Sequence, residues 1–167
     1  MRLLVADDDP VVQESVRARL ERWGYEVEVA GNGLEAWACL TASGEFAVAL
    51  LDCDMPGLTG MALSRRIRES ALPTLRRLFV VLMSADPSGN HLLDCRDAGA
   101  DEFLPKPLDP RVLASRLREV ERRGWRRVEF EDGFFLHAPW RRARPLQTPR
   151  GKALSDGPTA TAPPSRG

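Results

Sequence analysis

The chain has 167 residues, of which 43% are hydrophobic, and this suits one domain of ordinary size with some extra length. No segment approaches the roughly 20 apolar residues of a membrane-spanning helix, and the acidic residues 7–9 stand where a signal peptide would be apolar, so we expect neither membrane insertion nor secretion. The three cysteines are widely spaced and odd in number, which argues against a disulfide framework or a zinc site and predicts a reducing, cytoplasmic location.

The net charge of zero hides an asymmetry along the chain. Residues 1–121 carry 14 basic and 20 acidic residues, whereas residues 122–167 carry 10 basic and 4 acidic residues. The chain is therefore an acidic body with a basic tail. Of the 24 basic residues, only Lys106 and Lys152 are lysine.

The chain begins with a predicted strand and helix. Residues 3–6 are apolar and predict a buried strand, and apolar residues at helical spacing predict a helix over 10–23. Asp9 is a good N-cap for this helix, and proline suits its first position. The residues expected to face inward from it are Val12, Val16, Leu20 and Trp23.

The rest of the body repeats this alternation. The runs 46–51 and 78–83 are apolar throughout and predict strands that are buried on both faces. Further strands are expected over 25–30 and 102–105, and further helices over 34–41, 59–70, 90–98 and 110–122. The last helix should turn inward Val112, Leu113, Leu117 and Val120. Such βα alternation predicts an α/β fold with a doubly wound five-stranded parallel sheet and helices on both faces.

Polar side chains follow four of these strands. Asp7 and Asp8 follow the first, Asp52 the third, Ser84 the fourth and Lys106 the fifth. In a doubly wound sheet, ligands bind at the carboxyl ends of the strands. We therefore expect these side chains to meet at one edge of the sheet.

Crowded carboxylates there predict a cation site. Asp7, Asp8 and Asp52 would repel each other, and Mg²⁺ prefers hard oxygen ligands of this kind. Asp9 caps the helix instead. Lys106 would add a second positive charge, and a carboxylate flanked by Mg²⁺ and an ammonium can attack phosphorus and carry an aspartyl phosphate.

Each of these features also has a plain structural interpretation. Three aspartates before a proline suit helix capping and solvation, Ser84 could cap the following segment, and Lys106 could be a solvated surface charge. The joint pattern favours the site, because a lysine stands before Pro107 in a chain whose basic residues are otherwise almost all arginine.

Residues 1–121 resemble a receiver domain of the two-component response regulators. The motifs are VADDD, LLDCDMPGLTG, VLMSA and AGADEFLPKP, and the resemblance covers about three quarters of the chain. It implies a flavodoxin-like sheet with strand order 2-1-3-4-5 and a cis bond between Lys106 and Pro107. We place the receiver domain at residues 1–122.

The resemblance also assigns roles to individual residues. It implies that Asp52 is the phosphoacceptor, that Ser84 and Lys106 assist catalysis, and that Ser84 and Phe103 are the switch pair. The implied Mg²⁺ ligands are Asp7, Asp8, Asp52 and the backbone carbonyl of Asp54. Thr59 stands where the family often has an acid, and Phe103 lacks the hydroxyl of a tyrosine, but neither departure removes chemistry.

The function implied is that of a stand-alone response regulator rather than an enzyme. A histidine kinase or histidine phosphotransfer protein would donate a phosphoryl group to Asp52, and self-catalysed transfer and autodephosphorylation would be the only reactions. Phosphorylation would draw in Ser84, turn Phe103 inward and remodel the face formed by residues 90–98, 102–105 and 110–122, which would contact a downstream protein.

The remaining residues have a different character. Residues 123–142 form an aromatic and basic extension that could make a hairpin around Asp132 and Gly133. Residues 143–167 are rich in proline and poor in large apolar side chains, which predicts a disordered tail. The extension would pack on the receiver or, as an alternative, serve as a docking segment for nucleic acid or a partner protein.

Two other functions compete with the protein-contact regulator. One is a nucleic-acid-binding regulator that uses the basic tail. The other is a phosphatase of the haloacid dehalogenase type, which also uses a D-x-D motif after a strand, here Asp52 and Asp54. That motif has Thr or Val where this chain has Pro56, and it usually follows the first strand.

Overall fold

The computed structural model describes residues 1–42, 45–86 and 88–123. The extension 123–142, apart from its first residue, and the tail 143–167 lie outside the described residues, so the hairpin and the disorder remain predictions. No helix in the described ranges combines the length and the apolar character needed to cross a membrane.

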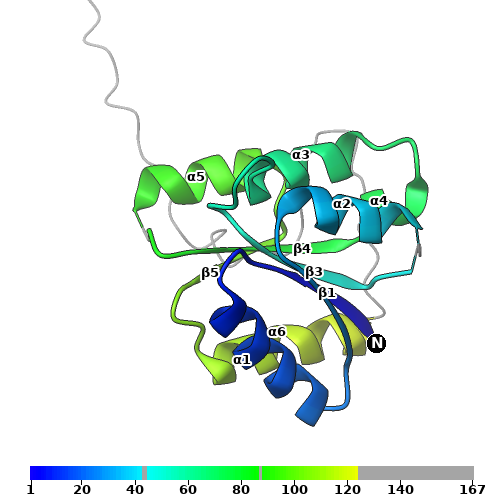
Figure 1. Ribbon diagram of the computed structural model, residues 1–167, viewed down its shortest axis with the longest axis vertical. Helices are drawn as coiled ribbons and strands as arrows, with labels where there is room; N and C mark the ends of the chain where they lie inside the picture. Colours follow the sequence, from blue (N-terminus) through cyan, green and yellow to red (C-terminus); the bar gives the residue numbers. More distant parts are fainter. Residues whose placement is uncertain (43–44, 87, 124–167) are drawn as a thin grey trace, which may run out of the picture.

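The described strands form one parallel sheet of five strands in the order β2-β1-β3-β4-β5, which confirms the predicted fold class. The strands are β1 (Arg2–Ala6), β2 (Glu26–Ala30), β3 (Val48–Asp52), β4 (Phe79–Ser84) and β5 (Glu102–Pro105). The helices are α1 (Pro10–Arg22), α2 (Gly33–Ala42), α3 (Gly60–Glu69), α4 (Pro73–Arg76), α5 (Gly89–Asp97) and α6 (Pro110–Arg123). Helices α1 and α6 cover one face of the sheet, and α2, α3, α4 and α5 cover the other (Figure 1).

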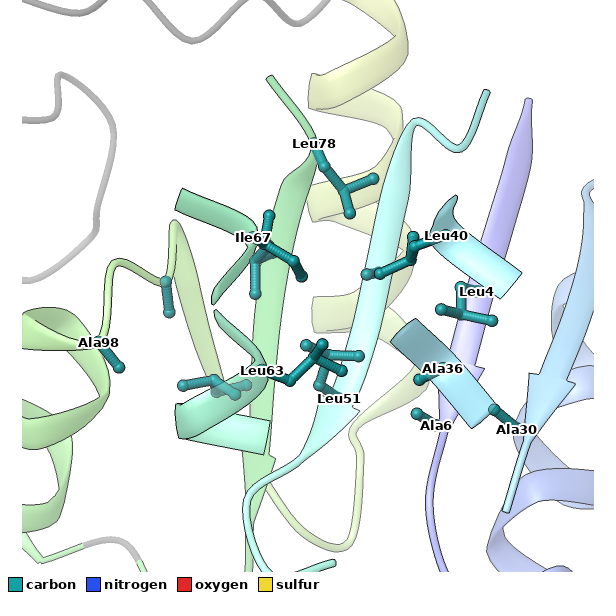
Figure 2. Close-up of a cluster of buried hydrophobic side chains, with 14 of the residues drawn as sticks. Leu4, Ala6, Ala30, Ala36, Leu40, Leu51, Leu63, Ile67, Leu78 and Ala98 are labelled. Carbon is teal, nitrogen blue, oxygen red and sulfur yellow. The ribbon is translucent and has the colours of Figure 1, made fainter. Parts of the chain in front are cut away.

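Alternate strand residues supply two cores. Leu4 and Ala6 of β1 point toward α2 and α3, whereas Leu3 and Val5 point toward α1 and α6. Figure 2 shows side chains of the first core meeting between the sheet and its helices. Because both faces are covered, all five residues of β3 and all six of β4 are buried, as their apolar runs predicted.

The sequence placed the elements to within one or two residues but missed α4. This short helix begins at Pro73 and buries Leu75 between α3 and β4. Two side chains expected to face inward are exposed: Trp23 by 38% and Val112 by 40%. Trp23 lies past the last turn of α1 as its C-cap residue. Val112 precedes Leu113 by one position, which rotates it about 100° from the buried stripe of α6.

Candidate acidic site at the carboxyl ends of the strands

Asp7 lies directly after β1 and is fully buried. Its Oδ1 accepts a hydrogen bond of 3.1 Å from the backbone N–H of Asp9, and Asp9 caps α1 as predicted by accepting from the N–H of Val11. The side-chain amide of Gln13 donates to the carbonyl of Asp7 at 2.5 Å and to that of Ala30 at 3.4 Å. The first turn of α1 therefore fixes the backbone on which Asp7 stands.

Asp52 is the last residue of β3 and is 4% exposed. The sheet holds the next residue as well, since the N–H of Cys53 donates to the carbonyl of Met83 at 2.8 Å. Helix α3 begins very close by, because a Cβ at Gly60 would lie 2.1 Å from the Asp52 carbonyl oxygen. Glycine is therefore required at position 60 for α3 to begin against the end of β3.

Lys106 joins the two buried carboxylates. Its Nζ lies 2.8 Å from Oδ2 of Asp7 and 2.8 Å from Oδ1 of Asp52. It follows β5, its N–H donates to the carbonyl of Ser84 at 2.7 Å, and its bond to Pro107 is cis as expected. Lys106 is thus a partner in a buried cluster and not a solvated surface charge.

Asp8 completes a set of carboxylates with an excess of negative charge. One oxygen from each of Asp7, Asp8 and Asp52 lies within 4.8 Å of the others, although the side chain of Asp8 is exposed. Three carboxylates share one ammonium, so the group has a formal charge of −2 if all are ionised. This donor set of hard oxygens fits a divalent cation such as Mg²⁺.

The pKa values of Asp52 and Lys106 are both raised in this crowded cluster. Burial raises the pKa of Asp52; the ammonium of Lys106 and a backbone hydrogen bond from Asp54 oppose that effect, and the charge of Asp7 adds to it. Burial lowers the pKa of Lys106, but its contacts with Asp52 and Asp7 outweigh this, so the pKa is raised above the ordinary value.

The other residues expected at the site contact different groups. Ser84, the last residue of β4, is fully buried, and its Oγ accepts a hydrogen bond of 3.1 Å from the N–H of Asp86. Phe103 is half-buried in β5 and meets the ring of His91 edge-on at 6.2 Å. Asp54 has an exposed side chain. The direct ionic contacts thus join Lys106 to Asp7 and Asp52.

Three residues that support the site were not predicted to do so from the sequence. Gln13 and Gly60 position the backbone at Asp7 and Asp52, and Thr59, noted only as a departure from the family, caps α3 by accepting from the N–H of Ala62 at 3.2 Å. A polar residue in the first turn after the aspartates and a glycine at the start of a helix are weak signals. Their roles depend on how closely the start of a helix approaches the end of the preceding strand, which the sequence does not specify.

A family model described as the response regulator receiver domain matches residues 3–118. The chain belongs to this family. Its receiver domain is 35% identical over 126 residues to the transcriptional regulatory protein AruR of Pseudomonas aeruginosa, covering 73% of this chain and 50% of AruR. The chain as a whole is also 35% identical over 159 residues to the transcriptional regulatory protein CseB of Streptomyces avermitilis, covering 93% of this chain and 60% of CseB.

Solved structures show the same fold. The receiver domain of a Francisella response regulator superposes with a TM-score of 0.65 at 28% identity, covering 74% of this chain and 98% of that domain. The chain spans about half to three fifths of the length of the curated relatives just named. The family is therefore shown for the receiver domain, and the sheet order and family match both favour this assignment over the haloacid dehalogenase alternative.

Proposed function

We propose that the receiver domain accepts a phosphoryl group on Asp52 from a phosphohistidine of a histidine kinase or phosphotransfer protein. The observation that carries this proposal is the contact of one buried ammonium with two buried carboxylates at 2.8 Å each, beside a third carboxylate. This arrangement holds Asp52 at a strand end, next to positive charge, as a nucleophile toward phosphorus must be held.

The proposed step is a transfer from nitrogen to oxygen. An oxygen of Asp52 forms a bond to phosphorus while the bond between phosphorus and the donor imidazole nitrogen breaks, and the imidazole departs with that electron pair. Lys106 lies where it can exchange its contact with Asp52 for one with the incoming phosphoryl oxygens, because its Nζ already spans Asp7 and Asp52.

Magnesium would be held by Asp7, Asp8 and Asp52 together with the backbone carbonyl of Asp54. When bound, it would supply the positive charge that offsets the carboxylates and the phosphoryl oxygens. Asp7 has a fixed orientation, since Oδ1 accepts from Asp9 and Oδ2 contacts Lys106. The exposed Asp8 is the member of the set that is free to adjust.

Signalling would pass through the loop after β4. The Ser84 hydroxyl now accepts from the N–H of Asp86 and would turn its proton toward the phosphoryl group. Phe103 lies beside His91 of α5, so a shift of this loop would change the packing of Phe103 and the face formed by α5, β5 and α6. We propose that this face binds the downstream protein in its phosphorylated form, and that the chain works through protein contact.

A second candidate is regulation of transcription, which is favoured because AruR and CseB are transcriptional regulatory proteins. For this chain it would require nucleic-acid contacts from residues beyond α6, where the basic charge is concentrated. A labelled duplex that binds at low salt, with affinity falling as salt rises, would support it. No binding at low salt would leave the protein-contact proposal.

The phosphoacceptor is tested by incubation with acetyl phosphate and Mg²⁺, followed by mass spectrometry of the intact chain and its peptides. We expect one added phosphoryl group, located at Asp52, and none in Asp52→Asn. The exposed Asp97, whose ion pair is with Arg96, provides the matched control, and Asp97→Asn should be phosphorylated normally. A phosphoryl group on another residue, or undiminished uptake in Asp52→Asn, would refute the assignment.

A further inference from the structure

A second cluster of metal-ligating side chains lies beside the phosphoacceptor strand. Cys53 follows β3, and His91 and Cys95 belong to α5. The two sulfur atoms lie 3.7 Å apart, and one ligand atom from each of the three residues lies within 4.8 Å of the others. Because His91 and Cys95 are four positions apart, they share one face of α5.

The surroundings of this cluster leave a polar atom unsatisfied. Both cysteines are fully buried, and Nε2 of His91 is buried with no hydrogen-bond partner in the part of the chain that the structure describes. A buried polar atom without a partner is costly, and each such atom calls for an explanation. A bound ion that takes imidazole as a ligand would supply one.

The sulfur separation matches a tetrahedral metal centre. Zinc bonds to cysteine sulfur at about 2.3 Å, so two sulfurs on a tetrahedral ion lie about 3.8 Å apart. The observed 3.7 Å needs almost no rearrangement of the two side chains. We infer that Cys53, Cys95 and His91 form a thiolate–imidazole site for Zn²⁺, whose fourth position is filled by water.

This site is chemically and spatially distinct from the acidic one. Asp52 and Cys53 are neighbours at the end of an extended strand, so their side chains point to opposite sides, and Cys53 packs in the core beneath α2, α3 and α5. Thiolate and imidazole select zinc, whereas carboxylates select Mg²⁺. The wide spacing of the cysteines argued against a zinc site, because only the fold brings residue 53 to α5.

Zinc at this position would link α5 to the end of β3, beside the phosphoacceptor. Both thiols would release their protons to solvent on binding. The ion would then hold the first two turns of α5 against the end of β3, next to Asp52, through a histidine whose ring meets that of Phe103 edge-on. The inference does not depend on phosphorylation, since none of its three ligands belongs to the acidic site.

Cobalt titration of the full chain under a phosphine reductant tests the site. Thiolate ligation of Co²⁺ gives a near-ultraviolet sulfur-to-metal band that carboxylates cannot give. We expect this band to saturate at one Co²⁺ per chain and to disappear when Zn²⁺ is added. Two control variants should keep the band, because neither changes a proposed ligand. Cys39→Ser removes the remaining cysteine, which is half-buried on α2, and Asp52→Asn alters the acidic site.

Two variants should impair the site. Cys95→Ser should abolish the band, and His91→Gln should weaken Co²⁺ binding by about tenfold or more, since even the loss of a ligand's supporting contact costs that much. Circular dichroism verifies that each variant is folded, and the half-buried His91 provides the test should Cys95→Ser not fold. Absence of the band in the native chain, its persistence in Cys95→Ser, or its loss in Cys39→Ser would overturn the inference.

Discussion

Two clusters of buried charge lie at opposite ends of β5, and their charges balance differently. Before the strand, Asp101 pairs with Arg68 of α3 at 2.5 Å on one face of the sheet, and Glu102, the first residue of the strand, pairs with Arg116 of α6 at 2.9 Å on the other face. After the strand, Lys106 serves both Asp7 and Asp52, with Asp8 close by. The first cluster matches each acid with its own base, whereas the second has three acids for one base.

The Arg68–Asp101 pair of this cluster also makes backbone hydrogen bonds. Arg68 donates to the carbonyls of Gly99 and Leu78, both at 2.8 Å, while Asp101 accepts from the N–H of Val80 at 2.8 Å. These contacts join α3 to the amino ends of β4 and β5. The acidic cluster lacks a matching base for each acid among the described residues, and its excess of negative charge is what a cation and a phosphoryl group would use. Burial of charge alone does not distinguish a structural cluster from a functional one, but charge balance does.

The largest effect should come from breaking the paired cluster. Arg68→Met leaves a buried carboxylate without its partner, which typically costs about 3–5 kcal/mol. We expect a loss of that size in the free energy of unfolding, measured with urea. Lys106→Met should also destabilise the chain, but Mg²⁺ should restore part of its stability, since the acidic cluster can take a cation in place of the ammonium. Restoration of Arg68→Met by Mg²⁺ to the same extent would contradict the distinction.

The acidic cluster should respond with the opposite sign to the loss of an acid. Asp8→Asn removes one of three crowded carboxylates, so the metal-free chain should gain up to about 1 kcal/mol of stability. Its Mg²⁺ affinity, measured by calorimetry, should fall by about tenfold, because the cation loses a charged ligand. Asp9→Asn is the matched control, since asparagine is an equally good N-cap. Unchanged Mg²⁺ binding in Asp8→Asn would make Asp8 an ordinary surface acid.

The pH dependence of stability should expose the paired cluster. Burial raises the pKa of Asp101 to about 6, against the attraction of Arg68, and raises that of Glu102 to about 7, against Arg116. The native state therefore holds protons that the unfolded chain has lost between about pH 4.5 and 7, so these groups favour folding most at low pH.

We thus expect the free energy of unfolding to fall as the pH rises from 5 to 8, by roughly 4 kcal/mol if both raised pKa values act in full. Urea titrations at several pH values, with EDTA present, would measure it. Glu102→Gln should flatten the upper part of this profile. A native chain whose stability rises with pH over this interval would show that pairing with Arg68 and Arg116 outweighs burial.

The acidic cluster could be predicted from the sequence, whereas the paired cluster could not. Alternating apolar runs predicted the strands and helices, and the acids and a lysine at strand ends were expected to meet at one edge of the sheet. The direct contacts of Lys106 with Asp7 and Asp52 there come from the structure. The paired cluster left no such signal, because an arginine in α3 and an aspartate 33 positions later meet only in the folded chain. The proximity of Cys53 and Cys95, 42 positions apart, was hidden for the same reason.

The smallest effect is expected from removing the tail. Every residue of both charge clusters lies before position 117, and residues 143–167 hold few large apolar side chains that burial could stabilise. A chain ending at residue 142 should keep its melting temperature and its uptake of phosphate from acetyl phosphate.

A chain ending at residue 123 is the informative comparison, because it also loses the aromatic side chains of Trp125, Phe130, Phe134, Phe135 and Trp140. Five large aromatic side chains are expected to pack against the receiver domain or a partner rather than remain in water. The shorter chain should therefore melt at a lower temperature or lose a binding partner, while Asp52 is still phosphorylated. If it keeps both its stability and all its interactions, the aromatic extension serves neither the fold nor docking.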